Sequence, residues 1–286
     1  MEKKFLLVGA LLLAGGFSTM NADVIYVTES GSGDGTSWSS AASLEDALSW
    51  AAAGDEVFVA KGTYTGSFKL RAAAKVYGNC VGTETEPPTY TTAEGLETFL
   101  KGPGGKRVLY LDGKASEIYG LDISGGDAST ETTGVGRGGG VYINNGGATL
   151  KYCNIHDNIG VDGSKNILGS NGKALKGVGG GLYVLNGRLE NCIIENNIAT
   201  TAPWEDTSKT WSTGIGGGIC LDATEGNGCN PDNAIVLNCI IRNNSTTPTD
   251  DGDSFQSQGG GIAIKSGKLI NSLVVGNSVN GSLNNQ

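Results

Sequence analysis

A glycine triplet followed by a short apolar run occurs four times in the second half of this chain. The four segments read GGGVYI, GGGLYV, GGGICL and GGGIAI, and they begin at Gly138, Gly179, Gly216 and Gly259. A second motif follows each of them, reading LKYCNIHDN, LENCIIENN, VLNCIIRNN and LINSLVVGN in turn. Four matches with coincident apolar and polar positions indicate an internal repeat, which restricts the fold to a stack of similar units.

The pattern inside a unit favours strands over helices. The triplets start 41, 37 and 43 residues apart. Apolar runs of three or four residues alternate with Gly or Asn, which is typical of brief strands joined by tight corners. Three short strands per unit, each paired with its equivalent one rung away, describe a parallel β-helix. We therefore predict an all-β, single-stranded solenoid.

Equivalent residues of the units should lie above one another. The shared positions are Leu150, Leu189, Val236 and Leu269, then Cys153, Cys192, Cys239 and Ser272, and finally Asn158, Asn197, Asn244 and Asn277. The first set predicts an internal aliphatic stack and the cysteines a small core column. Asn191, Asn238 and Asn271 predict an asparagine ladder at a corner, because asparagine tolerates the left-handed conformation. Tyr152 takes that position in the first unit and should break the ladder.

Residues 55–137 contain less regular strand-like runs and read as degenerate rungs before the triplet repeats of residues 138–286. A short helix is predicted in front of them, at about residues 43–54. Ser43 is its expected N-cap, with Asp46 three residues on, and Gly54 is its stop. Its apolar face should cover the open end of the solenoid, which needs such a cap.

The first 22 residues have the pattern of an export signal. Lys3 and Lys4 precede a short apolar run that ends at Phe17, and Ala22 is a small residue suited to cleavage. The apolar run is shorter than the roughly 20 residues that cross a bilayer, so we expect no membrane span after removal of the signal. We place residues 23–286 in one β-helix domain that is secreted or displayed at the outer-membrane surface.

The net charge of −9 argues against nucleic-acid binding, which needs a basic face. Gly134, Gly136 and Gly139 satisfy the spacing of a dinucleotide-binding loop. That loop must open a helix, however, and here a strand-like run follows, so nucleotide binding is not predicted.

Taken together, three stretches resemble a known family: YVTESGSGDGTSWSSAASLEDALSWAAAGDEVFVAKGTYTG, VYGNCVGTETEPP and the triplet units. They resemble exported right-handed parallel β-helix proteins of the pectin-lyase-like superfamily, most of all surface proteins of Bacteroidota. The triplets are also similar to repeats of polymorphic outer-membrane proteins. The resemblance covers nearly all of the mature chain and implies fold and compartment. The superfamily includes lyases, hydrolases and adhesins, so it implies no single activity. Relatives often continue into further rungs and an anchoring domain, so this chain can be a fragment.

Three long excursions leave the predicted coil after the paired asparagines and return at the triplets, at residues 159–178, 198–215 and 245–258. A stack places all three on one edge. Candidate ligand-binding residues on them are Trp204, Trp211, Asp250, Asp251 and Asp253. Tryptophan beside carboxylates suits a sugar, with the ring on the pyranose face and polar groups on the hydroxyls. The alternative is that the tryptophans only anchor long loops.

His156, Glu195 and Arg242 share one outward position on successive units. They are the candidate catalytic residues, as a column for proton transfer, and the alternative is a solvated charge ladder. No metal site is predicted, although a lyase of the pectate-lyase type would call for Ca²⁺. Cys220 and Cys229 bracket an insertion in the third unit and are candidates for a disulfide.

The leading functional hypothesis is a non-catalytic surface module that binds a polysaccharide, another glycan or a partner through the loop edge, without a cofactor. A polysaccharide lyase that cleaves uronate polymers by β-elimination is the alternative. A structural stalk or adhesin segment is the third.

Overall fold

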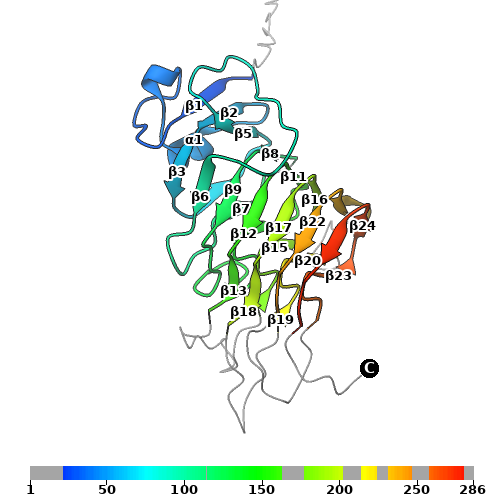
Figure 1. The fold of residues 1–286 in the computed structure, drawn as a ribbon. Helices are drawn as coiled ribbons and strands as arrows, with labels where there is room; N and C mark the ends of the chain where they lie inside the picture. Colours follow the sequence, from blue (N-terminus) through cyan, green and yellow to red (C-terminus); the bar gives the residue numbers. More distant parts are fainter. Residues whose placement is uncertain are drawn as a thin grey trace, which may run out of the picture.

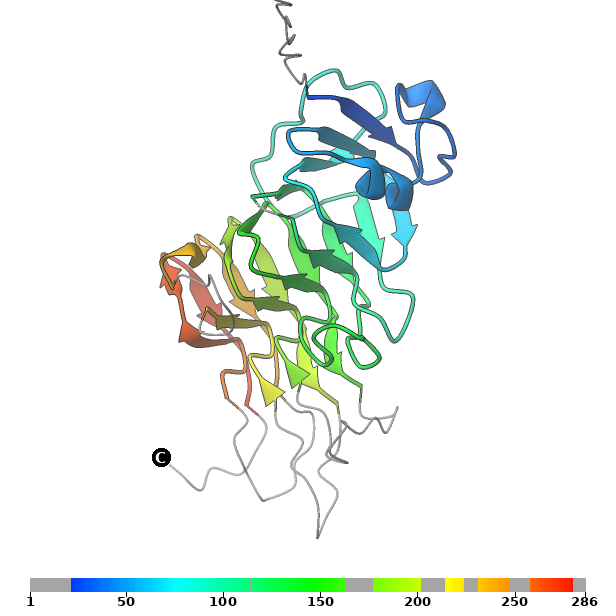
Figure 2. The ribbon, with the colours of Figure 1, turned by 180° about the vertical axis from the view of Figure 1, so that it is seen from behind.

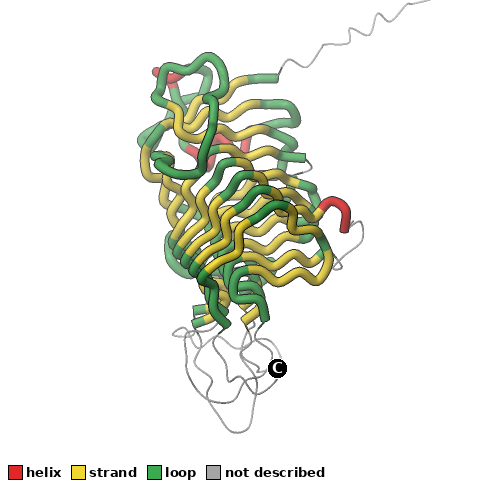
Figure 3. Tube along the Cα trace, turned by 45° about the vertical axis from the view of Figure 1, so that its right-hand side comes forward, coloured by secondary structure: helices red, strands yellow, loops and turns green. Residues whose placement is uncertain are grey.

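The strands of this chain form three long parallel sheets that run from the N-terminal to the C-terminal end (Figures 1 and 2). The structure, a computed structural model, describes residues 22–113, 115–162, 177–201, 214–223, 231–246 and 258–279. From β2 (Glu56–Ala60) onward, consecutive strands belong to different sheets, and neighbours within a sheet lie one turn of the coil apart. Figure 3 shows successive turns stacked in register. The predicted parallel β-helix is confirmed.

The sheets are named here A, B and C in the order in which the chain enters them. Sheet A holds eight strands, β1 (Val24–Val27), β2 (Glu56–Ala60), β5 (Lys75–Cys80), β8 (Glu117–Tyr119), β11 (Ala148–Lys151), β16 (Gly187–Glu190), β21 (Ala234–Leu237) and β24 (Lys268–Ile270). Sheet B holds seven, β3 (Gly62–Thr65), β6 (Thr98–Lys101), β9 (Asp122–Ser124), β12 (Asn154–His156), β17 (Ile193–Glu195), β22 (Ile240–Arg242) and β25 (Leu273–Val275). Sheet C holds six, β4 (Phe68–Leu70), β7 (Leu109–Leu111), β10 (Val141–Ile143), β15 (Leu182–Val184), β20 (Ile219–Asp222) and β23 (Ile262–Ser266).

The strand register agrees with the alignment of the repeats. In sheet A, Leu150 pairs with Leu189, Leu189 with Val236, and Val236 with Leu269. Side chains alternate across each short strand, so this position faces the interior in every coil. The cysteine column is also confirmed, since Cys153, Cys192 and Cys239 are all buried in the main core.

The corner between sheets A and B adopts the left-handed conformation that asparagine favours. Asn191 and Asn238 have φ of 54°, and Asn271 has φ of 44°. The side-chain amide of Asn271 donates to Asn238 Oδ1 at 2.7 Å, which is the predicted contact along the stack. Tyr152 takes the same conformation, with φ of 53°, and its ring stacks on Tyr90 instead.

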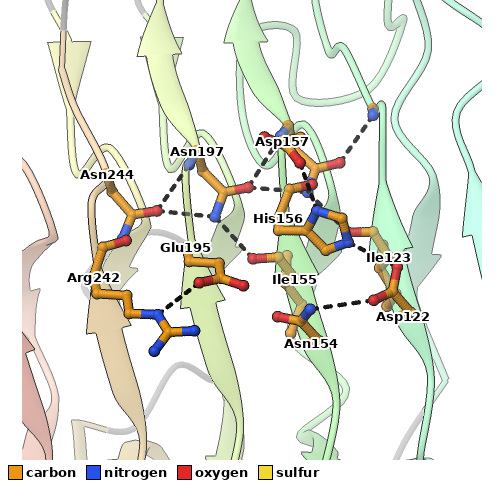
Figure 4. Close-up of polar contacts among 12 residues, drawn as sticks. Asp122, Ile123, Asn154, Ile155, His156, Asp157, Glu195, Asn197, Arg242 and Asn244 are labelled. Carbon is orange, nitrogen blue, oxygen red and sulfur yellow. Dashed lines mark hydrogen bonds and ion pairs between the residues drawn. The ribbon is translucent and has the colours of Figure 1, made fainter. Parts of the chain in front are cut away.

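A second asparagine ladder, buried in the wall of the coil, was not predicted. It consists of Asn158, Asn197, Asn244 and Asn277, the residues that close each unit. Asn197 and Asn244 are labelled in Figure 4. Nδ2 of each amide donates to Oδ1 of the next, at 3.0, 2.9 and 2.9 Å along the series. The backbone N–H of each donates to the same oxygen. The four repeat coils are therefore tied one to the next by asparagine amides, which are fully buried at Asn158, Asn197 and Asn244.

The residue before each ladder asparagine creates the turn that points the amide inward. Asp157, Asn196 and Asn243 have φ between 51° and 56°, and Gly276 has φ of 65°. All three residue types tolerate the left-handed region, and the bend that they produce sends the following side chain inward. In each pair, the first residue bends the chain and the side-chain amide of the second forms hydrogen bonds between neighbouring coils.

The glycine triplets lie against this ladder. The first glycine turns the chain, as at Gly179 with φ of 66°. The third is needed for space, because a Cβ on Gly181 would lie 2.9 Å from the Asn197 amide and 2.8 Å from Gly218 O. The triplet thus combines a turn of the chain with the close approach of neighbouring coils.

The predicted N-terminal cap is present as α1 (Leu44–Trp50). The Ser43 hydroxyl accepts a hydrogen bond from Asp46 N at 3.1 Å, as an N-cap should. Leu44, Ala47 and Leu48 are buried against the first strands of the coil. Two short 3-10 turns, η1 (Trp38–Ser40) and η3 (Pro231–Asn233), complete the described helical segments.

Candidate functional site

The three long excursions leave the coil at stacked positions. β13 (Ile159–Val161) and β18 (Ile198–Thr200) pair in parallel where the first two excursions begin. Isolated bridges extend this ladder from Ile198 to Ser245 and from Ser245 to Ser278. The departure points therefore share one edge of the coil, which we call the excursion edge.

The return points are stacked in the same way. β14 (Gly177–Val178) pairs in parallel with β19 (Gly214–Ile215), and a bridge continues the ladder from Ile215 to Gln258. Departing and returning strands also lie against each other, because a Cβ on Gly177 would fall 1.7 Å from Ala199 O. The strand on which the first excursion returns thus lies so close to the strand on which the second departs that Gly177 has no room for a side chain.

The candidate ligand-binding residues on the excursions are Trp204, Trp211, Asp250, Asp251 and Asp253. All five lie outside the described residues. The same is true of Cys229, so its pairing with the buried Cys220 stays a prediction.

The three candidate catalytic residues do stand in one column on the outer face of sheet B. His156 pairs in register with Glu195, and Glu195 with Arg242. The fourth member is Val275, which ends the polar series. Strand register alone produces this column, because each residue is the third of its three-residue strand.

His156 does not bond along the column but is held between two carboxylates (Figure 4). Its Nε2 lies 2.8 Å from Asp122 Oδ1, and its Nδ1 lies 2.7 Å from Asp157 Oδ2. The bond to Asp122, opposed by burial and assisted by Asp157, raises the pKa of His156 to about 9. The imidazole is therefore a cation at neutral pH, with both ring nitrogens donating.

Glu195 bonds to Arg242 instead. Arg242 Nε lies 2.6 Å from Glu195 Oε2, and this bond raises the pKa of the arginine further above its ordinary value. The column is thus two separate ion-pair groups, Asp122–His156–Asp157 and Glu195–Arg242. A general base needs a neutral nitrogen or an available carboxylate at the working pH. Here both nitrogens of His156 carry protons at neutral pH, and each of the three carboxylates already bonds to a cation of its group.

Asp122 is the residue of this cluster that sequence reasoning missed. It lies on β9, in the irregular part of the chain before the triplet repeats, and register places it beside Asn154, two residues before His156. Asn154 Nδ2 also donates to Asp122, at 3.2 Å to Oδ2. A signal existed in the segment LDIS, whose pattern matches the strand CNIH one coil later.

Within the described residues, no group of three metal-binding side chains converges. No helix in this part of the chain has the length and apolar character of a transmembrane segment.

Comparisons with known proteins found distant similarity that carries no argument. The chain matches no protein-family model and no curated protein. Among solved structures it is similar to a pectin methylesterase from Aspergillus niger, with a TM-score of 0.40, 13% identity, and 87% of this chain and 85% of that one covered. It is also similar to pectate lyase Pel9A, with a TM-score of 0.33, 11% identity, and coverages of 90% and 78%. Both are right-handed parallel β-helix proteins, and at these values neither carries an argument about chemistry.

Proposed function

We propose that this chain is an exported β-helix module that binds a glycan at the excursion edge and does not cleave it. The observation that carries the proposal is the stacking of the departure and return points of the three excursions. Segments that start and end side by side emerge from one edge of the coil, and binding residues concentrate on loops above a rigid scaffold. The tryptophans and aspartates of these segments have the chemistry that contacts sugar rings and hydroxyls.

The state of the polar column supports binding rather than turnover. His156 is a doubly bonded cation, and Arg242 is engaged by Glu195. A uronate lyase needs a base that removes a proton from the sugar carbon, together with a cation that stabilises the charge that develops. The charged side chains of both groups are instead bonded to one another, which fits a structural role on sheet B.

The test is a panel of uronate-containing polysaccharides, measured in parallel for retention of the protein and for ultraviolet-absorbing unsaturated products. We expect retention without product. Trp204→Ala and Trp211→Ala should each abolish retention, whereas Trp50→Ala should not, because Trp50 is 50% exposed on α1, away from the excursion edge.

Other results would replace the proposal. Product formation that is lost on chelation of Ca²⁺ or in Arg242→Ala would identify a lyase. Neither retention nor product on any polymer would favour a structural stalk. N-terminal sequencing of the secreted chain tests export, and we expect it to begin at Asp23, after the predicted signal.

A further inference from the structure

Two asparagine–glycine dipeptides lie in the described part of the chain, and the fold holds them differently. Asn145–Gly146 and Asn186–Gly187 both occur where the chain turns from sheet C into sheet A, in successive coils. We call this place the C–A corner. Asparagine is a chemically labile residue, most of all before glycine, because glycine has no side chain to obstruct its own backbone nitrogen.

The first dipeptide is open to reaction. Asn145 is exposed, and it forms a turn with Gly146 between β10 and β11. The Gly146 N–H makes no hydrogen bond within the described residues, so no neighbouring coil fixes this nitrogen. A turn outside both strands can rotate to bring the Gly146 nitrogen to the side-chain carbon Cγ of Asn145.

The second dipeptide is protected by the coil. Asn186 is only 8% exposed, and its Nδ2 donates to Asn145 O at 3.1 Å. Gly187 begins β16 and pairs in register with Ala148 on one side and Ala234 on the other. A strand held on both sides cannot turn its nitrogen toward the preceding side chain unless the corner opens first.

We propose that Asn145 is a site of spontaneous deamidation in the folded protein, and that its isoaspartate product loosens the C–A corner. The Gly146 nitrogen attacks Asn145 Cγ, so that an N–Cγ bond forms and the Cγ–Nδ2 bond breaks. Ammonia leaves with the proton of the attacking nitrogen, and a succinimide ring remains. Water then opens the ring at either carbonyl and leaves aspartate or isoaspartate. Water is the only co-reactant, and the product carries an added negative charge.

The loosening follows from the hydrogen bonds of this turn. Asn145 O accepts from Asn186 Nδ2 in the following coil, and Gly146 O accepts from Ala115 N at 2.8 Å in the preceding one. Isoaspartate continues the main chain through Cβ and Cγ, so both acceptors move. Asn186 Oδ1 is already buried without a partner among the described residues. Displacement of Asn145 O therefore leaves both polar atoms of the Asn186 amide unpaired, which lowers stability.

The experiment is prolonged incubation of the purified, folded protein at neutral and at mildly alkaline pH. Peptide mapping by mass spectrometry locates deamidation, and an isoaspartate-specific methyltransferase detects isoaspartate. We expect both at Asn145, and faster at the higher pH because the attacking nitrogen must lose its proton. Asn186 is the internal control, and it should react at least about tenfold more slowly because its corner must open first. In urea the two asparagines should react at comparable rates.

Gly146→Ala is the matched variant. Gly146 does not have a positive φ, so alanine fits its backbone, while the added Cβ obstructs the attacking nitrogen. This variant should keep the Asn145 amide, and circular dichroism shows whether its coil is intact. Incubated wild-type protein should unfold at a lower urea concentration than fresh protein, whereas incubation should not change the midpoint of Gly146→Ala.

The outcomes separate the two parts of the proposal. Deamidation of Asn145 and not of Asn186 in the folded protein, prevented by Gly146→Ala, supports the modification site. Equal rates at the two asparagines overturn it, as does an Asn145 amide that survives in the folded protein and reacts only in urea. An unchanged urea midpoint in protein that carries isoaspartate at this position overturns the loosening of the corner.

Discussion

The two asparagines that end the second repeat are Asn196 and Asn197. Substitution of one should lower the stability of the protein far more than substitution of the other. Asn196 is exposed and has φ of 55°, whereas its neighbour Asn197 is fully buried in the ladder. Replacement of Asn196 by glycine keeps the left-handed turn and should change the free energy of unfolding by less than about 0.5 kcal/mol. Replacement of Asn197 by alanine removes a side chain on which two neighbouring coils depend.

The magnitude follows from the bonds of that amide. Asn197 Oδ1 accepts from the backbone N of Asn158 at 3.1 Å and from its Nδ2 at 3.0 Å. Asn197 Nδ2 donates to Ile155 O and to Asn244 Oδ1, both at 2.9 Å. A net hydrogen bond contributes about 1 kcal/mol, and a buried donor left unpaired costs about 1–3 kcal/mol. We therefore expect Asn197→Ala to lower the free energy of unfolding by about 4 kcal/mol.

Equilibrium unfolding in urea, followed by circular dichroism and by fluorescence, measures both variants. The two probes must report coincident transitions, because stacks of repeats can unfold in parts. Asn196→Ala serves as a further control, with an expected cost of about 1 kcal/mol for placing a Cβ without a polar group in the left-handed region. The ladder interpretation is refuted if Asn197→Ala costs no more than Asn196→Ala.

Three further predictions test other features. The pKa of His156 is raised to about 9, so the stability it contributes is complete below its ordinary value of 6.5 and is lost as the pH rises from there through 9. Such a rise is equivalent to roughly 3 kcal/mol, and solvent screening of the exposed Asp157 should reduce it to about 1–2 kcal/mol; pH-dependent urea unfolding should show this loss in the wild type and not in His156→Gln. The thiols of the cysteine column should resist iodoacetamide in the native protein and react after unfolding, as mapped by mass spectrometry. Burial raises the pKa of the Cys192 thiol, and the hydrogen bond between Cys239 and Cys192 raises the pKa of the Cys239 thiol. Ser43→Ala should cost about 1 kcal/mol through loss of the N-cap, whereas Ser43→Asp should be tolerated in the same unfolding assay.

The repeats made the fold predictable from sequence because register follows directly from their alignment. Once Leu150, Leu189 and Val236 are placed one above another, strand direction, the aliphatic core and the outward column of His156 all follow. The cap was predictable for a different reason, since capping residues and a helical apolar face are local signals.

The buried ladder was harder to predict because both asparagines of a pair fit a corner equally well. The varying residue was informative: the first position reads Asp, Asn, Asn and Gly, which share only tolerance of the left-handed region, while the second is always Asn. The carboxylates around His156 depend on a different kind of information. Asp122 belongs to a coil with no glycine triplet to anchor an alignment, so its place beside Asn154 depends on the weaker match of LDIS to CNIH one coil later.

The ladder amides all point the same way, with each donating toward the following coil and accepting from the preceding one. A repeat coil can therefore be duplicated or deleted as a unit, because the coils on its two sides present the same amide donors and acceptors to each other. We expect a gene for such a molecule to lengthen or shorten its product by in-frame duplication or loss of one unit. Each event would shift everything beyond it by one rung, about 4.8 Å, and leave every remaining coil bonded as before.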